Sequence, residues 1–440
     1  MAHGNVWRMI ATLIARLRHN EFAWTFLWVS GARIGTLLFS MLGTVLIYRV
    51  LASTSGGMAE AGHFAIAMAV VRILTSCIGG TSDLVVLRRV PVLIHSDRAR
   101  AGEVVRASFV LRAGALALVL VVALLLKRVF AEVFLDGAAE APLVLLMVAA
   151  AAGELLLRSV LTLFQATERF DRFVMFEGGF QFARLACVAG LYGAGALSVA
   201  GVLGFYAICG LGVAAAAWQR MPRGLLVWDR VPAGVLRESF VFFAWTIAGF
   251  IVVASTERAD LFMLSRYLGV DQVGTYGGVL ALAVIPDYVG GLLGTVLQPR
   301  VVRLREAGTL LAFHRRLVLG MLPVVVVGML VLLAIADPLI GLLLGPKFLT
   351  AVPSFLVLAA GACAWLLLSP VSAVLITLTA PRITMVLCLV QLVVMVGAGM
   401  VLIPAHGILG AAAAVAGTRA LLGVVVFTIG EWLMRRPAAA

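Results

Sequence analysis

Charged side chains lie inside long apolar stretches of this 440-residue sequence, where they could bind ions or charged ligands. They comprise six arginines and six acids: Arg33, Arg72, Arg158, Arg184, Arg258, Arg419, Asp83, Glu154, Glu177, Glu257, Asp260 and Asp287. An ionised side chain at the centre of a bilayer costs about 2.5–3.5 kcal/mol on the insertion scale. Most of these groups must therefore face protein or water, which makes each a candidate for function.

Arg33 and Arg72 differ from the other intramembrane arginines because no acid lies within one helical turn of either. They stand in consecutive apolar spans joined by a short loop, at similar depths. Two unpaired guanidiniums near the midplane would suit an anion, and their planar forks match phosphate oxygens in particular. The pattern favours an anion site, with snorkelling or a carbonyl partner as the competing interpretation.

Other charges have a simpler structural interpretation. Glu154 and Arg158 are four residues apart, so they should pair on one helical face. Asp83 is close to a basic span end and is expected to form an ion pair there. Arg419 has no nearby acid in its own span, and an interhelix hydrogen bond is the expected role.

The remaining intramembrane charges leave their roles open. Arg184 lies two turns after Glu177, too far for contact on one helix, so the sequence gives it no partner, although it could support an anion site. Glu257, Arg258 and Asp260 cluster near an expected outer helix end. Either that end is solvated or the cluster is a working site.

Asp287 is a carboxylate halfway along an apolar span, directly after Pro286. A proline frees a backbone carbonyl on the preceding turn, which provides a hinge and a further oxygen. The pair predicts a site for coupling or gating that responds to H⁺, Na⁺ or membrane potential. No other cofactor and no metal site are expected.

The composition identifies an integral membrane protein. Hydrophobic residues make up 63% of the chain and the mean hydropathy is +1.10, whereas only 12% of residues are charged. The net charge of +13 is divided among short loops, so the positive-inside rule explains it and no nucleic-acid partner is expected. All five cysteines lie in apolar runs, which excludes a disulfide framework.

Apolar periodicity predicts an all-α integral membrane fold with about twelve transmembrane helices. An amphipathic helix on the membrane surface is expected first, within residues 1–22. The spans follow at about 23–48, 61–86, 107–130, 142–164, 173–195, 200–218, 239–263, 273–297, 317–336, 353–377, 383–403 and 408–430. Arg and Lys number 22 in one set of alternate connections and 5 in the other, which places both termini in the cytoplasm.

The polar segment 219–238 divides these spans six and six. A shift of 214 residues lays Gly80-Thr81 on Gly294-Thr295 and Arg89 on Arg303. We therefore expect two six-helix bundles, residues 23–218 and 239–430, related by a pseudo-two-fold axis along the membrane normal. Segment 219–238 is the cytoplasmic linker and 431–440 a cytoplasmic tail. Transporters of this design bind substrate between the halves.

No enzymatic site is evident. The sequence has no nucleophile motif, P-loop or dinucleotide fingerprint, and its histidines lack metal-ligand spacing. The outer loops are short, so a soluble-type active site has no domain to hold it. A membrane transporter is the expected class.

Four segments in matching order carry a resemblance to a known family. They are residues 259–305, which include LFMLSRYLG, VGTYGGVLAL and LQPRVVRL, then Gly79–Val90, Pro338–Pro353 and Ile403–Ala414. The sequence resembles the polysaccharide-exporter branch of the multidrug/oligosaccharidyl-lipid/polysaccharide superfamily.

The resemblance implies a flippase in the bacterial cytoplasmic (inner) membrane. Its substrate would be a polyprenyl-diphosphate-linked oligosaccharide, moved from the inner to the outer leaflet through a cationic cavity between the bundles. Related lipid-linked precursor flippases keep arginines in their first two spans, where Arg33 and Arg72 stand here. Polymerase and glycosyltransferase proteins of the same glycan pathway are the implied partners.

Three alternatives remain open. A cation-coupled multidrug antiporter of the same superfamily would want a carboxylate in the first span, and no acid occurs between Glu21 and Glu60. A membrane-embedded enzyme of glycan assembly would need a sizeable outer loop, and the outer loops of this sequence are short. A non-transporting component of a glycan-assembly complex is also compatible with the sequence.

Overall fold

The computed structural model describes residues 21–54, 56–221, 230–378 and 381–435. The expected surface helix at Val6–Asn20 lies outside the described residues, as do parts of the linker 219–238 and of the tail 431–440. Helices make up nearly all of the described chain, and no strand occurs in it. The all-α expectation is therefore confirmed for these residues.

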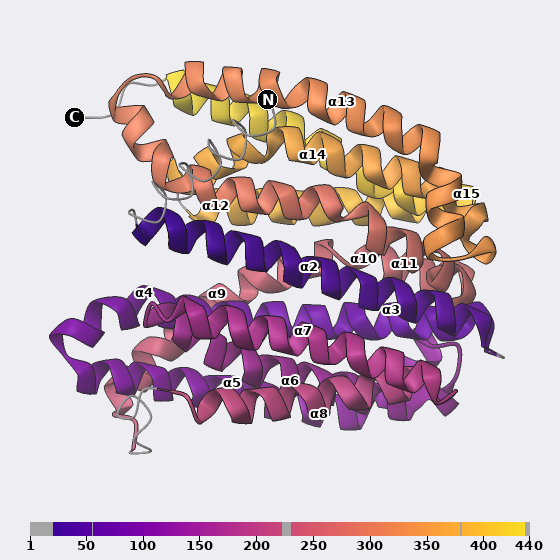
Figure 1. Cartoon of the computed structure of the whole chain (residues 1–440), viewed down its shortest axis with the longest axis horizontal. Helices are drawn as coiled ribbons and strands as arrows, with labels where there is room; N and C mark the ends of the chain where they lie inside the picture. The colour runs from indigo at the N-terminus through magenta and orange to yellow at the C-terminus, as the bar shows by residue number, and fades with distance from the viewer. Residues whose placement is uncertain (1–20, 55, 222–229, 379–380, 436–440) are drawn as a thin grey trace, which may run out of the picture.

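The first group of helices runs from residue 21 to residue 218. It comprises α2 (Glu21–Ser53), α3 (Gly57–Leu74), the π-helix η1 (Thr75–Gly80), α4 (Thr81–Ser96), α5 (Arg98–Phe134), η2 (Ala138–Glu140), α6 (Ala141–Ala166), α7 (Phe170–Gly193) and α8 (Val199–Trp218). α2 packs on α7, and α6 packs on α8. These helices occupy one side of the molecule in Figure 1.

The second group begins after the linker. It comprises α9 (Ala233–Thr256), α10 (Ala259–Leu268), α11 (Val270–Ala283), α12 (Ile285–Glu306), α13 (Leu310–Leu343), η3 (Pro346–Ala351), α14 (Val352–Leu378) and α15 (Pro381–Arg435). α14 packs on α12, α13 and α15. In Figure 1, α12 to α15 form the other side of the molecule, while α9 and α11 reach across to the first group.

Nine helices of the described chain are long and apolar enough to cross a membrane, or ten if the bent pair Val270–Ala283 and Ile285–Gly291 is one span. Twelve spans were expected, and the difference has physical causes. The charges of α7 lower its hydropathy, and the last two expected spans form the single element α15, broken at Gly407 with φ 62°. The span expected at 239–263 ends at Thr256, before the separate helix α10.

The two groups meet most closely where α3 crosses α11. A Cβ atom on Gly62 would lie 2.0 Å from the Val270 carbonyl oxygen, and one on Gly274 would lie 2.2 Å from that of Met58. Only glycine permits this backbone approach. We call this contact the glycine seam.

Side chains reinforce the seam at the same end of the molecule. The Asp136 carboxylate accepts a hydrogen bond of 2.8 Å from the Val270 amide at the start of α11, and the Lys347 ammonium donates to the Ala52 carbonyl at 2.6 Å. The first contact uses the free donors of a helix N-terminus. The two groups are therefore joined by backbone contact, a helix cap and a charged hydrogen bond.

Candidate functional site

Two cavities lie beside the glycine seam. The N-terminal cavity, of about 530 Å³, is lined by α2, α3, α6, α7 and part of α10 to α12. The C-terminal cavity, of about 620 Å³, is lined by α9, α11, α12, α14 and α15, with Arg72 from α3. The two share the lining residues Arg72, Arg258, Leu280, Val284, Asp287, Tyr288 and Gly291, so they meet at one junction.

Arg72 projects into this junction from the last turn of α3. It is half-buried, and its Nε atom is buried without a hydrogen-bond partner among the described residues. The π-helix η1 begins three residues later, and such wide turns occur often at functional sites. No described carboxylate lies within 4.0 Å of the Arg72 guanidinium, so its charge is available to a ligand.

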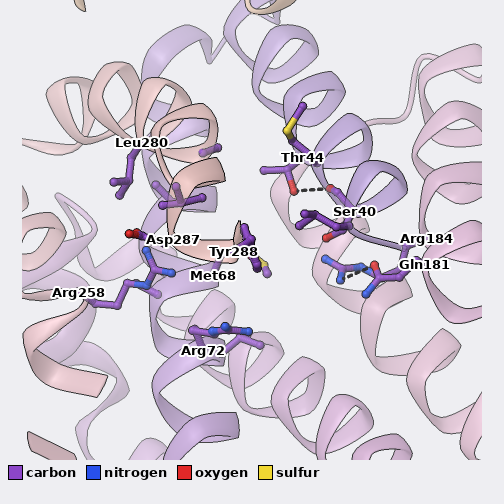
Figure 2. A pocket seen from close by; sticks show the side chains of 18 of the residues that line it. Ser40, Thr44, Met68, Arg72, Gln181, Arg184, Arg258, Leu280, Asp287 and Tyr288 are labelled. Carbon is purple, nitrogen blue, oxygen red and sulfur yellow. Dashed lines mark hydrogen bonds between the residues drawn. The ribbon is translucent and has the colours of Figure 1, made fainter. Parts of the chain in front are cut away.

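Arg258 reaches the same junction from the break between α9 and α10. The break places its backbone outside regular helix, and its Nε atom is also buried without a described hydrogen-bond partner. In Figure 2, Arg258 and Asp287 lie on one side of the N-terminal cavity, whereas Ser40, Gln181 and Arg184 lie on the opposite side. Arg72 from the first half of the chain and Arg258 from the second half therefore face one space, the junction of the two cavities.

Asp287 is held by an ion pair that the sequence did not predict. Its two carboxylate oxygens accept from both terminal nitrogens of Arg419, at 3.2 Å and 3.0 Å, so α12 and α15 are joined by a bidentate contact. Arg419 therefore makes the expected interhelix contact, with an acid as its partner. This pairing joins the two helices and offsets the charge of the Asp287 carboxylate.

Pro286 stands at a helix break. α11 ends at Ala283, α12 begins at Ile285, and the two segments differ in direction by 40°. A proline in the first turn of a helix needs no intrahelical partner for its nitrogen, which explains why α12 begins here. The geometry agrees with a hinge between the seam helix α11 and the junction residue Asp287.

Asp260 is buried, with 2% of its surface exposed, and it lines the C-terminal cavity. Its carboxylate accepts from the Tyr276 hydroxyl at 2.8 Å and from the Leu261 amide at 2.9 Å. Of the two interpretations that the sequence leaves open, this burial argues against a solvated helix end at Asp260. α10 turns Asp260 toward α11, so protein and not water surrounds it.

The N-terminal cavity contains the pair that helical spacing predicts. Arg158 Nε lies 3.6 Å from Glu154 Oε1 on α6, and both residues line the cavity with Glu177 from α7. This distance and partial exposure give a weak ion pair. The pair therefore reduces the net positive charge of this cavity.

Arg184 has an amide and an aromatic ring as partners, and neither is an acid. Its guanidinium lies 3.9 Å from the centre of the Tyr206 ring and donates to Gln181 Oε1 at 3.2 Å. Stacking on an aromatic face fixes the guanidinium plane while leaving its edge toward the cavity. Arg184 thus lines the N-terminal cavity, and its support of an anion site stays a prediction.

The remaining expected arginine, Arg33, lies on α2, and its side chain is outside the described residues.

Asp83 does not form its ion pair with the basic end of its span, where the sequence predicted one. Its carboxylate accepts from Arg112 Nη2 at 2.7 Å, and Arg112 also donates to Ser82, Ser159 and the Leu155 carbonyl.

Arg112 was not among the intramembrane charges that the sequence singled out, because it lies near the start of its apolar span. Only 4% of its surface is exposed. The sequence feature that indicates it is an arginine with no acid close by in its own span, one turn inside an apolar run. This network joins α4, α5 and α6 without lining either large cavity.

Comparison with known proteins places this geometry among transporter folds. No protein-family model matches the chain, and no curated protein sequence matches it. The structure is similar to the lipid II flippase MurJ in an inward closed conformation, with TM-score 0.71, 12% identity and coverage of 92% of this chain and 87% of that one.

Multidrug transporters of the MATE family show the same architecture. An inward-facing MATE transporter gives TM-score 0.63 at 12% identity over 91% of this chain and 94% of its own. A mutant of the Vibrio cholerae transporter VcmN gives 0.63 at 13% identity over 92% and 98%. The chain therefore shares the fold of these solved transporter structures.

Proposed function

We propose that the chain is a flippase that moves a polyprenyl-diphosphate-linked oligosaccharide across the bacterial inner membrane. The observation that carries the proposal is the junction of Arg72 and Arg258, two guanidiniums that face one space without a described carboxylate partner. Such forks bind phosphate oxygens in pairs, and a low-dielectric site strengthens the contact. A diphosphate supplies enough oxygens for both residues.

The proposed architecture has twelve spans in two six-helix bundles, with both termini in the cytoplasm. Counting α7 as a span and dividing α15 at Gly407 supports it, because each group then contains six crossings. In this orientation the glycine seam lies at the outer side of the membrane. The cavities then receive substrate from the inner leaflet, and parting of α3 from α11 releases it outward.

The seam can be tested by introducing a methyl group. Gly274→Ala places a Cβ atom against the Met58 backbone, which cannot yield as a flexible side chain would. In a cysteine-free background carrying Thr44→Cys in the N-terminal cavity, an impermeant maleimide added outside should label the Gly274→Ala protein several-fold faster. Gly212→Ala on α8, where nothing lies within 4 Å, is the matched control. Unchanged labelling would contradict the seam's role as outer closure.

The coupling site is assigned to Asp260 in preference to Asp287. Both carboxylates line the C-terminal cavity, but Asp287 is neutralised by Arg419, whereas Asp260 accepts from a phenol and a backbone amide. A buried carboxylate with neutral donors can gain a proton or Na⁺ at lower cost than one fixed in an ion pair. Tyr276 connects Asp260 to the seam helix α11, so ion binding can influence the closure.

A reconstituted flipping measurement tests the proposed function. Proteoliposomes containing the full chain should transfer a fluorescent polyprenyl diphosphate disaccharide to the outer leaflet, and Arg72→Ala should reduce the initial rate at least about tenfold, since one charged hydrogen bond contributes about 1.5–3 kcal/mol. Arg266→Ala is the matched control, because Arg266 is exposed on α10 and lines neither cavity. Equal rates for protein-free and protein-containing liposomes would reject the proposal.

A multidrug antiporter is the second candidate, and one observation favours it. The C-terminal cavity combines the carboxylates Glu257, Asp260 and Asp287 with the apolar side chains of Trp365 and Met395, which would suit a lipophilic cation. Expression in a drug-sensitive host should then raise resistance to such cations. The flippase proposal instead expects lipid-linked glycan to accumulate at the inner leaflet when the chain is deleted. Export of the glycan should also depend on the polymerase and glycosyltransferase proteins of the same pathway.

A further inference from the structure

The N-terminal cavity has a second wall whose polar side chains are not required for binding a diphosphate. On α2, Thr36, Ser40, Thr44 and Tyr48 follow one another at four-residue spacing, and all four line the cavity. This spacing places their hydroxyl groups in one stripe along one face of the helix. We call these residues the hydroxyl stripe.

The neighbouring helix α7 presents a complementary row. Glu177, Gln181 and Arg184 recur at spacings of four and three residues, and all line the same cavity. α2 packs on α7, so the two rows form one continuous polar wall. Figure 2 shows Ser40, Thr44, Gln181 and Arg184 together, opposite Asp287 and Arg258.

The hydrogen bonds within this wall determine what it can offer a ligand. Arg184 donates to the Gln181 carbonyl oxygen while stacked on Tyr206, which leaves the amide N–H donors of Gln181 for another acceptor. The Thr44 hydroxyl donates to the Ser40 carbonyl at 2.9 Å, so its oxygen remains an acceptor. The wall therefore supplies amide and guanidinium donors beside hydroxyl acceptors within a few helical turns.

This mixture of groups matches a carbohydrate. A sugar hydroxyl both donates and accepts, so a wall of hydroxyl, amide, carboxylate and guanidinium groups can satisfy several hydroxyls at once. The volume of about 530 Å³ falls within the range of small-molecule pockets, which leaves space for a sugar beside a diphosphate. The C-terminal cavity has no comparable stripe among its described lining residues, where Trp365, Leu375 and Met395 interrupt the polar groups.

We propose that the wall of α2 and α7 is a carbohydrate subsite that binds the sugar attached to the diphosphate, while Arg72 and Arg258 hold the diphosphate itself. The inference rests on the proposed flippase function and assigns an order to the substrate within the cavity. The lipid-linked end lies at the junction of the two cavities, and the glycan extends along α2. Discrimination among glycans then arises from Ser40, Thr44 and Gln181.

Binding of two defined lipids tests the subsite. The probes are a polyprenyl diphosphate carrying one N-acetylhexosamine and the same polyprenyl diphosphate without sugar, each titrated into the full chain in lipid nanodiscs. Gln181→Ala and Thr44→Val should weaken binding of the sugar-bearing lipid about tenfold, because each leaves sugar hydroxyls unpaired. Binding of the bare lipid should change less than twofold, whereas Arg72→Ala should weaken both.

Controls keep the outcomes distinct. Leu38→Ala changes an exposed side chain of α2 that does not line the cavity and should alter neither affinity. Thr44→Val preserves side-chain shape, so its effect does not depend on tolerance of a cavity. Equal losses for the two lipids, or no loss for either, would overturn the subsite while leaving the flippase proposal in place. If the parent chain binds neither lipid, both proposals fail.

Discussion

The two cavities have similar volumes but different chemistry. Their shared junction carries Arg72, Arg258 and Asp287, so the difference arises from the residues that each has alone. The N-terminal cavity adds the hydroxyl stripe and the row of polar residues on α7. The C-terminal cavity adds the acids Glu257 and Asp260, the basic Arg419 and scattered polar groups among apolar side chains such as Trp365 and Met395. One cavity can satisfy a large polar ligand, and the other can isolate a buried carboxylate.

Under the proposed function, we infer that the two cavities have different tasks. Recognition of a polar head group needs many modest hydrogen bonds, which a wide hydroxyl- and amide-bearing wall provides. Sensitivity to an ion needs a carboxylate whose charge is poorly compensated, which burial among apolar residues provides. The predictions below change one cavity at a time, from the largest expected effect to the smallest.

The largest effect is expected at the shared junction. Replacing Arg72 and Arg258 together by Ala should reduce flipping of the diphosphate-linked disaccharide to the rate of protein-free liposomes, because both forks for the phosphate oxygens are lost. The double lysine variant should retain part of the rate, since charge remains but bidentate geometry does not. Proteoliposome flipping measures the rate, and an unchanged rate in the double Ala protein would show that the junction does not bind the substrate.

A change in the C-terminal cavity should affect coupling more than binding. Asn at position 260 can still accept from the Tyr276 hydroxyl but cannot ionise. We expect Asp260→Asn to bind lipid within about twofold of the parent, while the flipping rate no longer responds to an imposed pH or Na⁺ gradient. The gradient response in proteoliposomes is the measurement.

Asp287→Asn serves as the comparison for that experiment, because the carboxylate it replaces is already paired with Arg419. If Asp287→Asn abolishes the gradient response and Asp260→Asn preserves it, the coupling assignment is reversed.

The ion pair between Asp287 and Arg419 should contribute to stability. Arg419→Ala leaves the half-buried Asp287 carboxylate unpaired, which we expect to destabilise the fold by about 1–3 kcal/mol. The double variant Asp287→Asn with Arg419→Gln should recover part of this loss, since neither remaining group is charged. Thermal unfolding in detergent measures the stability of these variants and of the single changes Asp287→Asn and Arg419→Gln. Additive effects of those two single changes would contradict a direct interaction.

The smallest effect is expected for the pair on α6 in the N-terminal cavity. Glu154→Gln removes a partner that lies 3.6 Å from Arg158 and is partly exposed. Such pairs contribute about 0.3–0.5 kcal/mol, so thermal stability should change little. The more cationic cavity should bind the bare polyprenyl diphosphate slightly more tightly. Weaker binding would indicate that Glu154 contacts the ligand directly.

Hydropathy predicted the multi-pass helical fold, and spacing within one helix singled out Arg72, which lines both cavities. Its role in binding an anion stays a prediction. The pair of Glu154 and Arg158 was predictable for the same reason, since its partners are four residues apart. The contacts of Asp287 with Arg419 and of Asp83 with Arg112 join different helices. Their geometry depends on packing, which one-dimensional periodicity does not contain.

The breaks near residues 257 and 284 were also only partly predictable. Pro286 indicated a hinge, and the structure places a 40° bend there. Nothing comparable marks the break after Thr256, so the sequence left open whether Asp260 lies at a solvated helix end, and the structure buries it. The glycine seam required knowledge of which helices cross, although its glycines were visible in the sequence.

The π-helix after Arg72 changes the direction in which the side chains beyond it face. Asp83 follows Arg72 by eleven residues, which in an uninterrupted α-helix amounts to three turns plus only about 20°, so both would share one face. A π turn holds an additional residue and rotates everything beyond it by roughly 100° about the helix axis. Asp83 therefore points toward Arg112 on α5, away from both cavities. The wide turn thus separates the helix face that carries Arg72 from the face that carries Asp83.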